Sequence, residues 1–80
     1  MKSIDSDIII QLENFIVPYG YEFQAIGKEI KLYLLDNGEI HIIVDQVIEI
    51  YTYNVNGCND KYSTENLIEA KAILQSILTS

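Results

Sequence analysis

The residues best suited to chemistry in this sequence are one histidine, one cysteine and twelve carboxylates, and their spacing matches no catalytic motif. His41 stands beside Ile42 and Ile43, and no serine or cysteine nucleophile accompanies it in a recognisable pattern. Cys58 lies among Asn and Gly residues, and one cysteine forms neither an internal disulfide nor the usual set of structural zinc ligands. We therefore expect no enzyme activity, no bound metal and no cofactor.

The segment around Gly57 has a weak likeness to a calcium-binding loop through Asn54 and Asn56. When Gly57 is aligned with the glycine that such a loop requires, Thr52 occupies the first ligand position and Ser63 the last. The calcium-binding pattern places a carboxylate at both of these positions. The sequence therefore indicates a tight turn at Asn56-Gly57 and no metal site.

The composition indicates one small acidic domain over residues 1–80. Twelve Asp and Glu residues face five lysines, no arginine is present, and the net charge is −7. This charge repels polyanions, so we expect neither direct nucleic-acid binding nor docking on an anionic membrane. It suits a protein partner with a basic surface, although solubility alone explains a charge of this size.

Targeting signals are not recognisable in the sequence. The first residues lack the basic and then apolar pattern of a signal peptide. No apolar run approaches the roughly 20 residues of a membrane-spanning helix. Together with the single cysteine, these observations lead us to expect a cytoplasmic location.

Helical periodicity marks both ends of the chain. Serine and aspartate residues precede Ile8, apolar residues recur at helical spacing, and Pro18 follows, which predicts a helix over about 5–16. Near the other end, Ser63 or Thr64 is expected to cap a second helix. The predicted buried stripe of this second helix consists of Leu67, Ala70, Leu74, Ile77 and Leu78, with Ile73 beside it.

Between the two helices the apolar period changes to two, as in strands that bury one face. Four such segments are predicted, at about 21–25, 29–34, 39–44 and 48–53, with a loop over 54–60. The expected fold class is α+β, with a four-stranded antiparallel β-meander flanked by an N-terminal and a C-terminal helix. Both helices are expected to cover the sheet face formed by Ile30, Leu32, Leu34, Ile40, Ile42 and Val44.

The strongest local signal is Asp36-Asn37-Gly38, between the second and third predicted strands. A two-residue Asn37-Gly38 loop would put the apolar rows of the two strands on opposite faces. A three-residue loop with a left-handed Gly38 puts both rows on one face, with Leu32 opposite Ile42. We expect the three-residue loop, because it alone lets one face be buried.

This arrangement turns a second set of side chains outward, onto a face that neither helix is needed to cover. The set comprises Tyr33, Leu35, Glu39, His41, Ile43, Glu49, Tyr51 and Tyr53. Tyrosines rimmed by acids are typical of protein-binding surfaces, because tyrosine gives a large rigid contact area and a hydroxyl group. Three explanations stay open: another protein binds here, a second copy does so in a homodimer, or a helix crosses to cover the face.

The size, the acidity and the absence of a catalytic motif resemble those of small phage-encoded inhibitors of host defence, including anti-CRISPR proteins, and of bacterial immunity and antitoxin proteins. The resemblance implies a non-enzymatic inhibitor or adaptor that binds a larger protein in the host cell cytoplasm. Acidic side chains of such a protein can mimic nucleic-acid phosphates. The candidates are Glu22, Glu29, Asp36 and Asp45, together with Glu39 and Glu49. The alternative is a self-associating structural or accessory protein.

Overall fold

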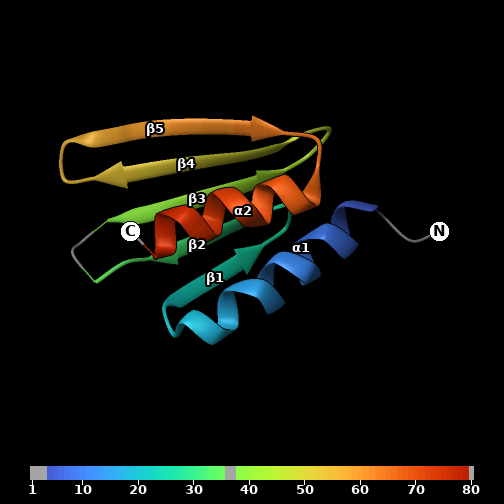
Figure 1. Ribbon diagram of the computed structural model, residues 1–80, viewed down its shortest axis with the longest axis horizontal. Helices are drawn as coiled ribbons and strands as arrows, with labels where there is room; N and C mark the ends of the chain where they lie inside the picture. Colours follow the sequence, from blue (N-terminus) through green and yellow to red (C-terminus); the bar gives the residue numbers. More distant parts are fainter. Residues whose placement is uncertain (1–3, 36–37, 80) are drawn as a thin grey trace.

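The structure is a computed structural model, which describes residues 4–35 and 38–79 (Figure 1). Its elements, in chain order, are α1 (Ile4–Ile16), the 3-10 helix η1 (Val17–Tyr19), β1 (Glu22–Ile26), β2 (Glu29–Tyr33), β3 (Glu39–Val44), β4 (Ile48–Asn54), β5 (Gly57–Thr64) and α2 (Leu67–Leu78). The predicted first helix is confirmed to within one residue. The loop residues Asp36 and Asn37 lie outside the described part of the chain.

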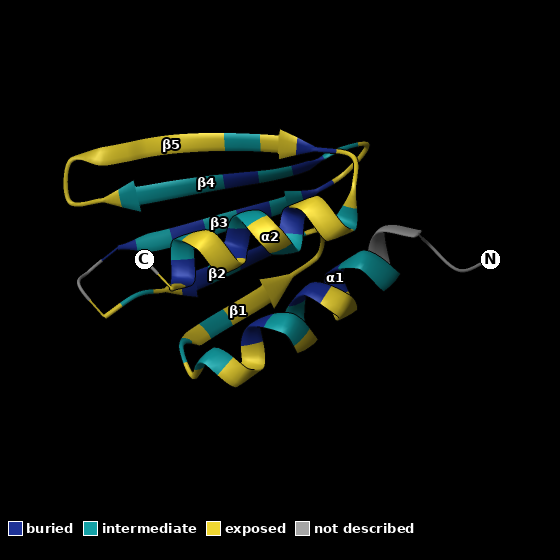
Figure 2. Ribbon diagram, in the orientation of Figure 1, coloured by how far each residue is buried: buried dark blue, intermediate teal, exposed yellow. Residues whose placement is uncertain are grey.

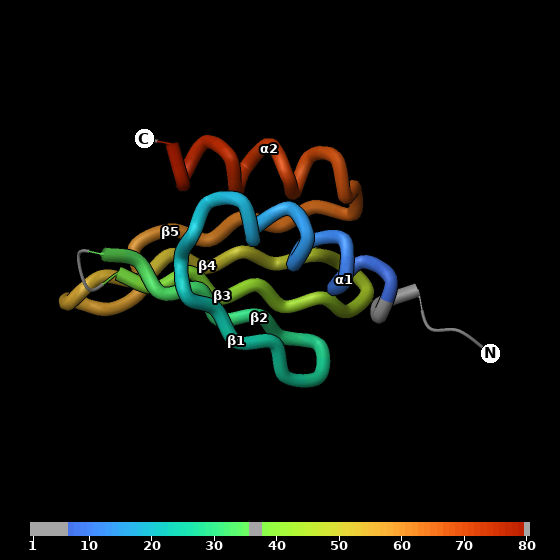
Figure 3. The backbone as a smooth tube through the Cα atoms, turned by 90° about the horizontal axis from the view of Figure 1, so that it is seen from below, coloured from blue at the N-terminus to red at the C-terminus, as the bar shows by residue number. Residues whose placement is uncertain are grey.

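The molecule has two layers, an antiparallel sheet and a pair of helices on one of its faces (Figures 1 and 3). The strands follow the order β1-β2-β3-β4-β5, so each pairs with its neighbour in the sequence. Helix α1 contacts β2 and β3, whereas α2 contacts β4 and β5. The prediction of an α+β fold with an antiparallel meander and two helices is confirmed, and the described chain places both helices on the same face.

The predicted number of strands is wrong, because the sheet has a fifth strand, β5, where a loop was expected over 54–60. This strand forms the sheet edge beyond β4, and most of its side chains are exposed. A strand whose side chains are mostly exposed does not carry the alternating apolar row from which strands are predicted in a sequence. A register shift opposite Thr52 and Tyr53 leaves Asn59 as an extra residue and breaks the alternation further.

The predicted cap of the second helix is also wrong, because Ser63 and Thr64 end β5 instead. The cap is Asn66, whose side-chain oxygen accepts hydrogen bonds from the backbone N–H groups of Ile68 at 2.8 Å and Glu69 at 3.3 Å. Asparagine is among the preferred residues at this position, because it satisfies backbone donors that lack a partner within the helix.

The core lies between the sheet and the helices, and the central strands supply most of it (Figure 2). The sheet contributes the buried residues Ile30, Leu32, Ile40, Ile42, Val44, Ile48 and Ile50. The helices contribute Ile9, Leu12, Ile16, Ala70, Leu74 and Leu78. The predicted inward face is therefore confirmed, with Leu34 half-buried at its margin.

The pairing of β2 with β3 differs from the predicted register by two residues. Leu32 lies opposite Ile40, whereas it was expected opposite Ile42. Beyond the ends of the strands, the Leu34 N–H donates to the Gly38 carbonyl at 2.9 Å. A shift of two residues preserves the facing of every side chain, so hydrophobic alternation alone could not distinguish the two registers.

Candidate protein-binding surfaces

Three cross-strand rows of side chains cover the sheet face opposite the helices, which we call the outer sheet face. Each row takes one residue from every strand, because neighbouring strands pair in register. The first row is Glu22, Tyr33, Glu39, Tyr53 and Cys58, the second is Gln24, Lys31, His41, Tyr51 and Lys61, and the third is Ile26, Glu29, Ile43, Glu49 and Ser63. The rows bring together the partner-binding candidates named from the sequence, except Leu35.

His41 occupies the centre of the outer sheet face, where its side chain is 20% exposed. Its Nε2 atom lies 2.8 Å from Glu39 Oε1, and its Nδ1 atom lies 4.0 Å from Glu29 Oε2. The ring of Tyr53 lies against the imidazole, with 4.4 Å between the ring centroids. The two carboxylates and the aromatic ring therefore hold the histidine in one orientation on the sheet.

Lys61 forms a second cluster on the outer sheet face. Its Nζ atom lies 3.4 Å from Glu49 Oε2 and 5.4 Å from the ring centroid of Tyr51. The hydrogen bond from Lys61 to Glu49 raises the pKa of Lys61 above its ordinary value, and Tyr51 adds to this effect. The outer sheet face thus already binds one cation of the chain between a carboxylate and an aromatic ring, an arrangement that attracts ammonium and guanidinium groups.

Tyr33 and Leu35 lie near one end of the outer sheet face. They line a hollow of about 300 Å³ together with Gly20, Tyr21, Glu22 and Leu34. Tyr33 is 37% exposed on β2, and Leu35 is 92% exposed in the turn after that strand. Leu35 therefore lies outside the three rows, at the end of the sheet.

Most of the carboxylates named as phosphate mimics lie apart from one another, whereas Glu29 and Glu39 flank the imidazole of His41. Glu22 is exposed on the edge strand β1, and Glu29 lies in the third row on β2. Asp45 lies in the turn after β3 and pairs with Lys28 at 3.3 Å. Asp36 lies outside the described residues. Glu22 and Glu39, the two glutamates of the first row, lie two strands apart, which corresponds to about 10 Å between their backbones.

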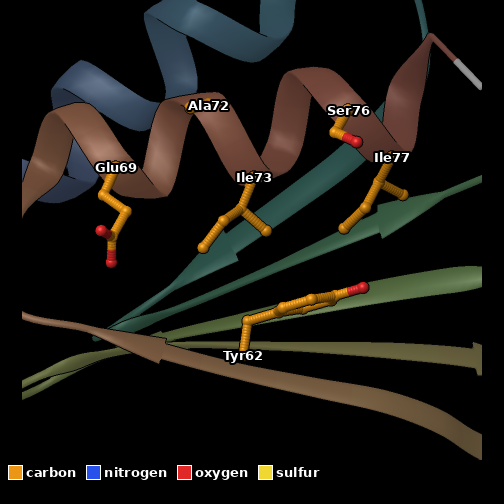
Figure 4. Close-up of a pocket in the computed structure, with 6 residues that line it drawn as sticks. All are labelled: Tyr62, Glu69, Ala72, Ile73, Ser76 and Ile77. Atoms are coloured by element: carbon orange, nitrogen blue, oxygen red, sulfur yellow. The ribbon is translucent and has the colours of Figure 1, made fainter.

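A second surface lies on the helix side of the molecule, between β5 and α2 (Figure 4). We call it the β5–α2 groove, and its walls are Tyr62, Glu69, Ala72, Ile73, Ser76 and Ile77. The groove has a volume of about 270 Å³, and Tyr62 lies across from Ile73 and Ile77. A hollow of about 290 Å³ continues it past Asp60.

The sequence did not indicate the surfaces to which the residues of β5 belong. These residues are Cys58, Lys61 and Ser63 on the outer sheet face, and Asp60 and Tyr62 at the β5–α2 groove and its continuation. A signal for this strand was present in Asn56-Gly57. Asn-Gly is a common turn of two-stranded hairpins, and Gly57 here has a φ of 114°, which strongly favours glycine. In the structure the two turn residues are Val55 and Asn56, and Gly57 begins β5 opposite Asn54. The dipeptide therefore marks the hairpin, although its position is one residue past the turn that it was expected to form.

Comparison with known proteins gave no match among protein-family models, curated protein sequences or solved structures. Within residues 4–35 and 38–79, no group of three or more His, Cys, Asp or Glu side chains is placed to hold a metal ion. In the same described ranges, neither helix has the length and apolar character needed to cross a membrane.

Proposed function

We propose that this protein is a non-enzymatic inhibitor or adaptor that binds a larger protein through its outer sheet face. The observation that carries the proposal is the position of α1 and α2. Both helices cover the inner face, so the described chain leaves the tyrosines and glutamates of the outer sheet face without a covering layer (Figure 3). A partner protein supplies that layer.

The partner has a basic surface. Four glutamates lie on the outer sheet face (Glu22, Glu29, Glu39 and Glu49), against Lys31 and Lys61. The Lys61 cluster supports the same preference, because a lysine or arginine of a partner finds the same combination of carboxylate and ring at Tyr33, between Glu22 and Glu39 in the first row.

The contacts among the side chains of the outer sheet face favour binding. His41, Tyr51 and Tyr53 are held by ring contacts, and His41 also by its hydrogen bond with Glu39, before any partner arrives. Side chains that are already ordered lose less conformational entropy when they enter an interface. The surface is therefore preformed, which suits a folded partner.

A phage-encoded inhibitor of host defence, of the anti-CRISPR kind, is the biological role that we favour. The support is the combination of an 80-residue chain, a net charge of −7 and an outward face of tyrosines and acids. Phosphate mimicry is one mode of such inhibition. It predicts that partner affinity falls steeply with salt, because exposed charges are screened within about 10 Å at 0.1 M ionic strength.

The test is capture of partners from a lysate of the natural host, with three immobilised forms of the protein. Wild type and Ile68→Asp, an exposed change on α2, are expected to retain the same partner, whereas Tyr51→Asp retains at least tenfold less. Equal capture by all three forms contradicts the proposal. Elution that is unchanged between about 50 and 500 mM salt removes the mimicry mode and leaves inhibition standing.

A further inference from the structure

We propose that the β5–α2 groove is a second binding site, which accepts an extended segment of a partner protein as an added strand beside β5. The segment has alternating apolar side chains and a basic residue near each end. This site lies on the helix side of the sheet, so it does not depend on the outer sheet face.

The backbone of β5 supplies the first reason. The strand ends the sheet, with β4 on one side and no described strand on the other. Alternate residues of such an edge direct N–H and C=O groups outward, where an extended chain can pair with them. From Asp60 to Thr64 the pairing with β4 is regular, so this half of β5 is a straight template, whereas the bulge at Asn59 limits its length.

The groove itself supplies the second reason. The helix-facing side of β5 is not fully covered by α2, and Tyr62, Ile73 and Ile77 stay half-buried there. A strand added beside β5 would point every second side chain toward this gap. The volume of about 270 Å³ lies just below the roughly 300–1,000 Å³ of small-molecule sites, so it fits a few aliphatic side chains.

Charge decides which occupant fits. Glu69 and Asp60 line opposite ends of the combined hollow, because each borders only one of its two parts. The nearest lysines point elsewhere, since Lys61 lies over Tyr51 on the outer sheet face and Lys71 lies 6.0 Å from the ring of Phe15 on α1. A segment with a basic residue near each end neutralises both carboxylates.

A second copy of the chain fits this site poorly. If two β5 strands paired antiparallel about Tyr62, Asp60 of each copy would lie opposite Thr64 of the other, at the end where Glu69 stands. Carboxylates of the two copies would then lie close together at both ends of the paired strands, and each copy has a net charge of −7.

The test uses a fluorescent peptide, Arg-Thr-Val-Thr-Val-Thr-Arg, whose arginines and valines share one face of a strand, and its acidic counterpart with Glu at both ends, titrated with the full chain and followed by anisotropy. Wild type is expected to bind the basic peptide at least tenfold more tightly than the acidic one. The double variant Asp60→Lys, Glu69→Lys is expected to reverse this preference. The matched control Glu22→Lys, Glu39→Lys changes the same number of charges on the outer sheet face and is expected to keep it.

Two further arms separate strand addition from simple charge attraction. Ala72→Arg fills the groove from the exposed side of α2 and is expected to abolish binding of both peptides. Two further peptides carry N-methyl groups, each on a different set of alternate amides. They are expected to differ in affinity, because methylation of only one of the two sets blocks binding. Equal binding by both methylated peptides, or an unchanged preference in the Asp60→Lys, Glu69→Lys variant, overturns the proposal. So does a homodimer that Ala72→Arg dissociates.

Discussion

At the scale of single residues, the outer sheet face is organised by His41 and Lys61, each of which lies beside a glutamate and a tyrosine ring. The sequence predicted the outward facing of His41 and its neighbours from alternation alone. It did not predict their pairing. That pairing depends on which residues of adjacent strands lie opposite one another, and Lys61 belongs to a strand that the sequence did not indicate.

The Lys61 cluster gives a prediction at this scale. Glu49→Gln is expected to lower the pKa of Lys61 toward its ordinary value, because the charged acceptor that chiefly raises it is lost. The folded-state pKa lies above the unfolded one, so the stabilising contribution is present at neutral pH and disappears as pH rises through the folded-state value. NMR titration of the Lys61 side chain measures the shift, and Glu65→Gln, away from the outer sheet face, is the control.

An unchanged Lys61 titration in the Glu49→Gln variant would show that the ion pair does not form in solution. The same result would weaken the argument that the outer sheet face attracts cations, because that argument uses Lys61 as its example.

At the scale of elements, the interior parts were predictable and the edge was not. Strands β2, β3 and β4 each bury one row of aliphatic side chains, and that row produces a pattern of period two. Strand β5 faces solvent along most of its length and contributes few core contacts, so its sequence is polar like that of a loop. The proposed strand-addition site therefore lies on the one strand that was not predicted from the sequence.

The start of α2 gives a prediction at the element scale. Asn66→Ala is expected to lower the free energy of unfolding by about 0.5–2 kcal/mol, because the Ile68 and Glu69 N–H groups lose their side-chain acceptor. Urea denaturation measures the change. Asn14→Ala, an exposed position within α1, is the matched control and should be neutral or slightly stabilising, since alanine has the higher helix propensity. Equal effects at both sites would contradict the assigned cap.

At the scale of the whole molecule, the layout has one consequence for function. Two helices on one face of a small sheet form a single core and leave the opposite face to other contacts. The sequence predicted the inward and outward rows because they differ in composition, but it left open whether a helix crosses to the outward face. It did not identify what lies on the outward face, since the identity of a partner is not encoded in the alternation of residues.

The most direct test of the central claim is sedimentation equilibrium of the wild-type chain at micromolar concentration, because it asks whether a second copy covers the outer sheet face. We predict a monomer of 9.1 kDa, with that face accessible to a different protein. A stable dimer of twice that mass, dissociated by Tyr51→Asp and by Ile43→Asp but not by Ile68→Asp, would contradict the account. Such a dimer would assign the outer sheet face to self-association.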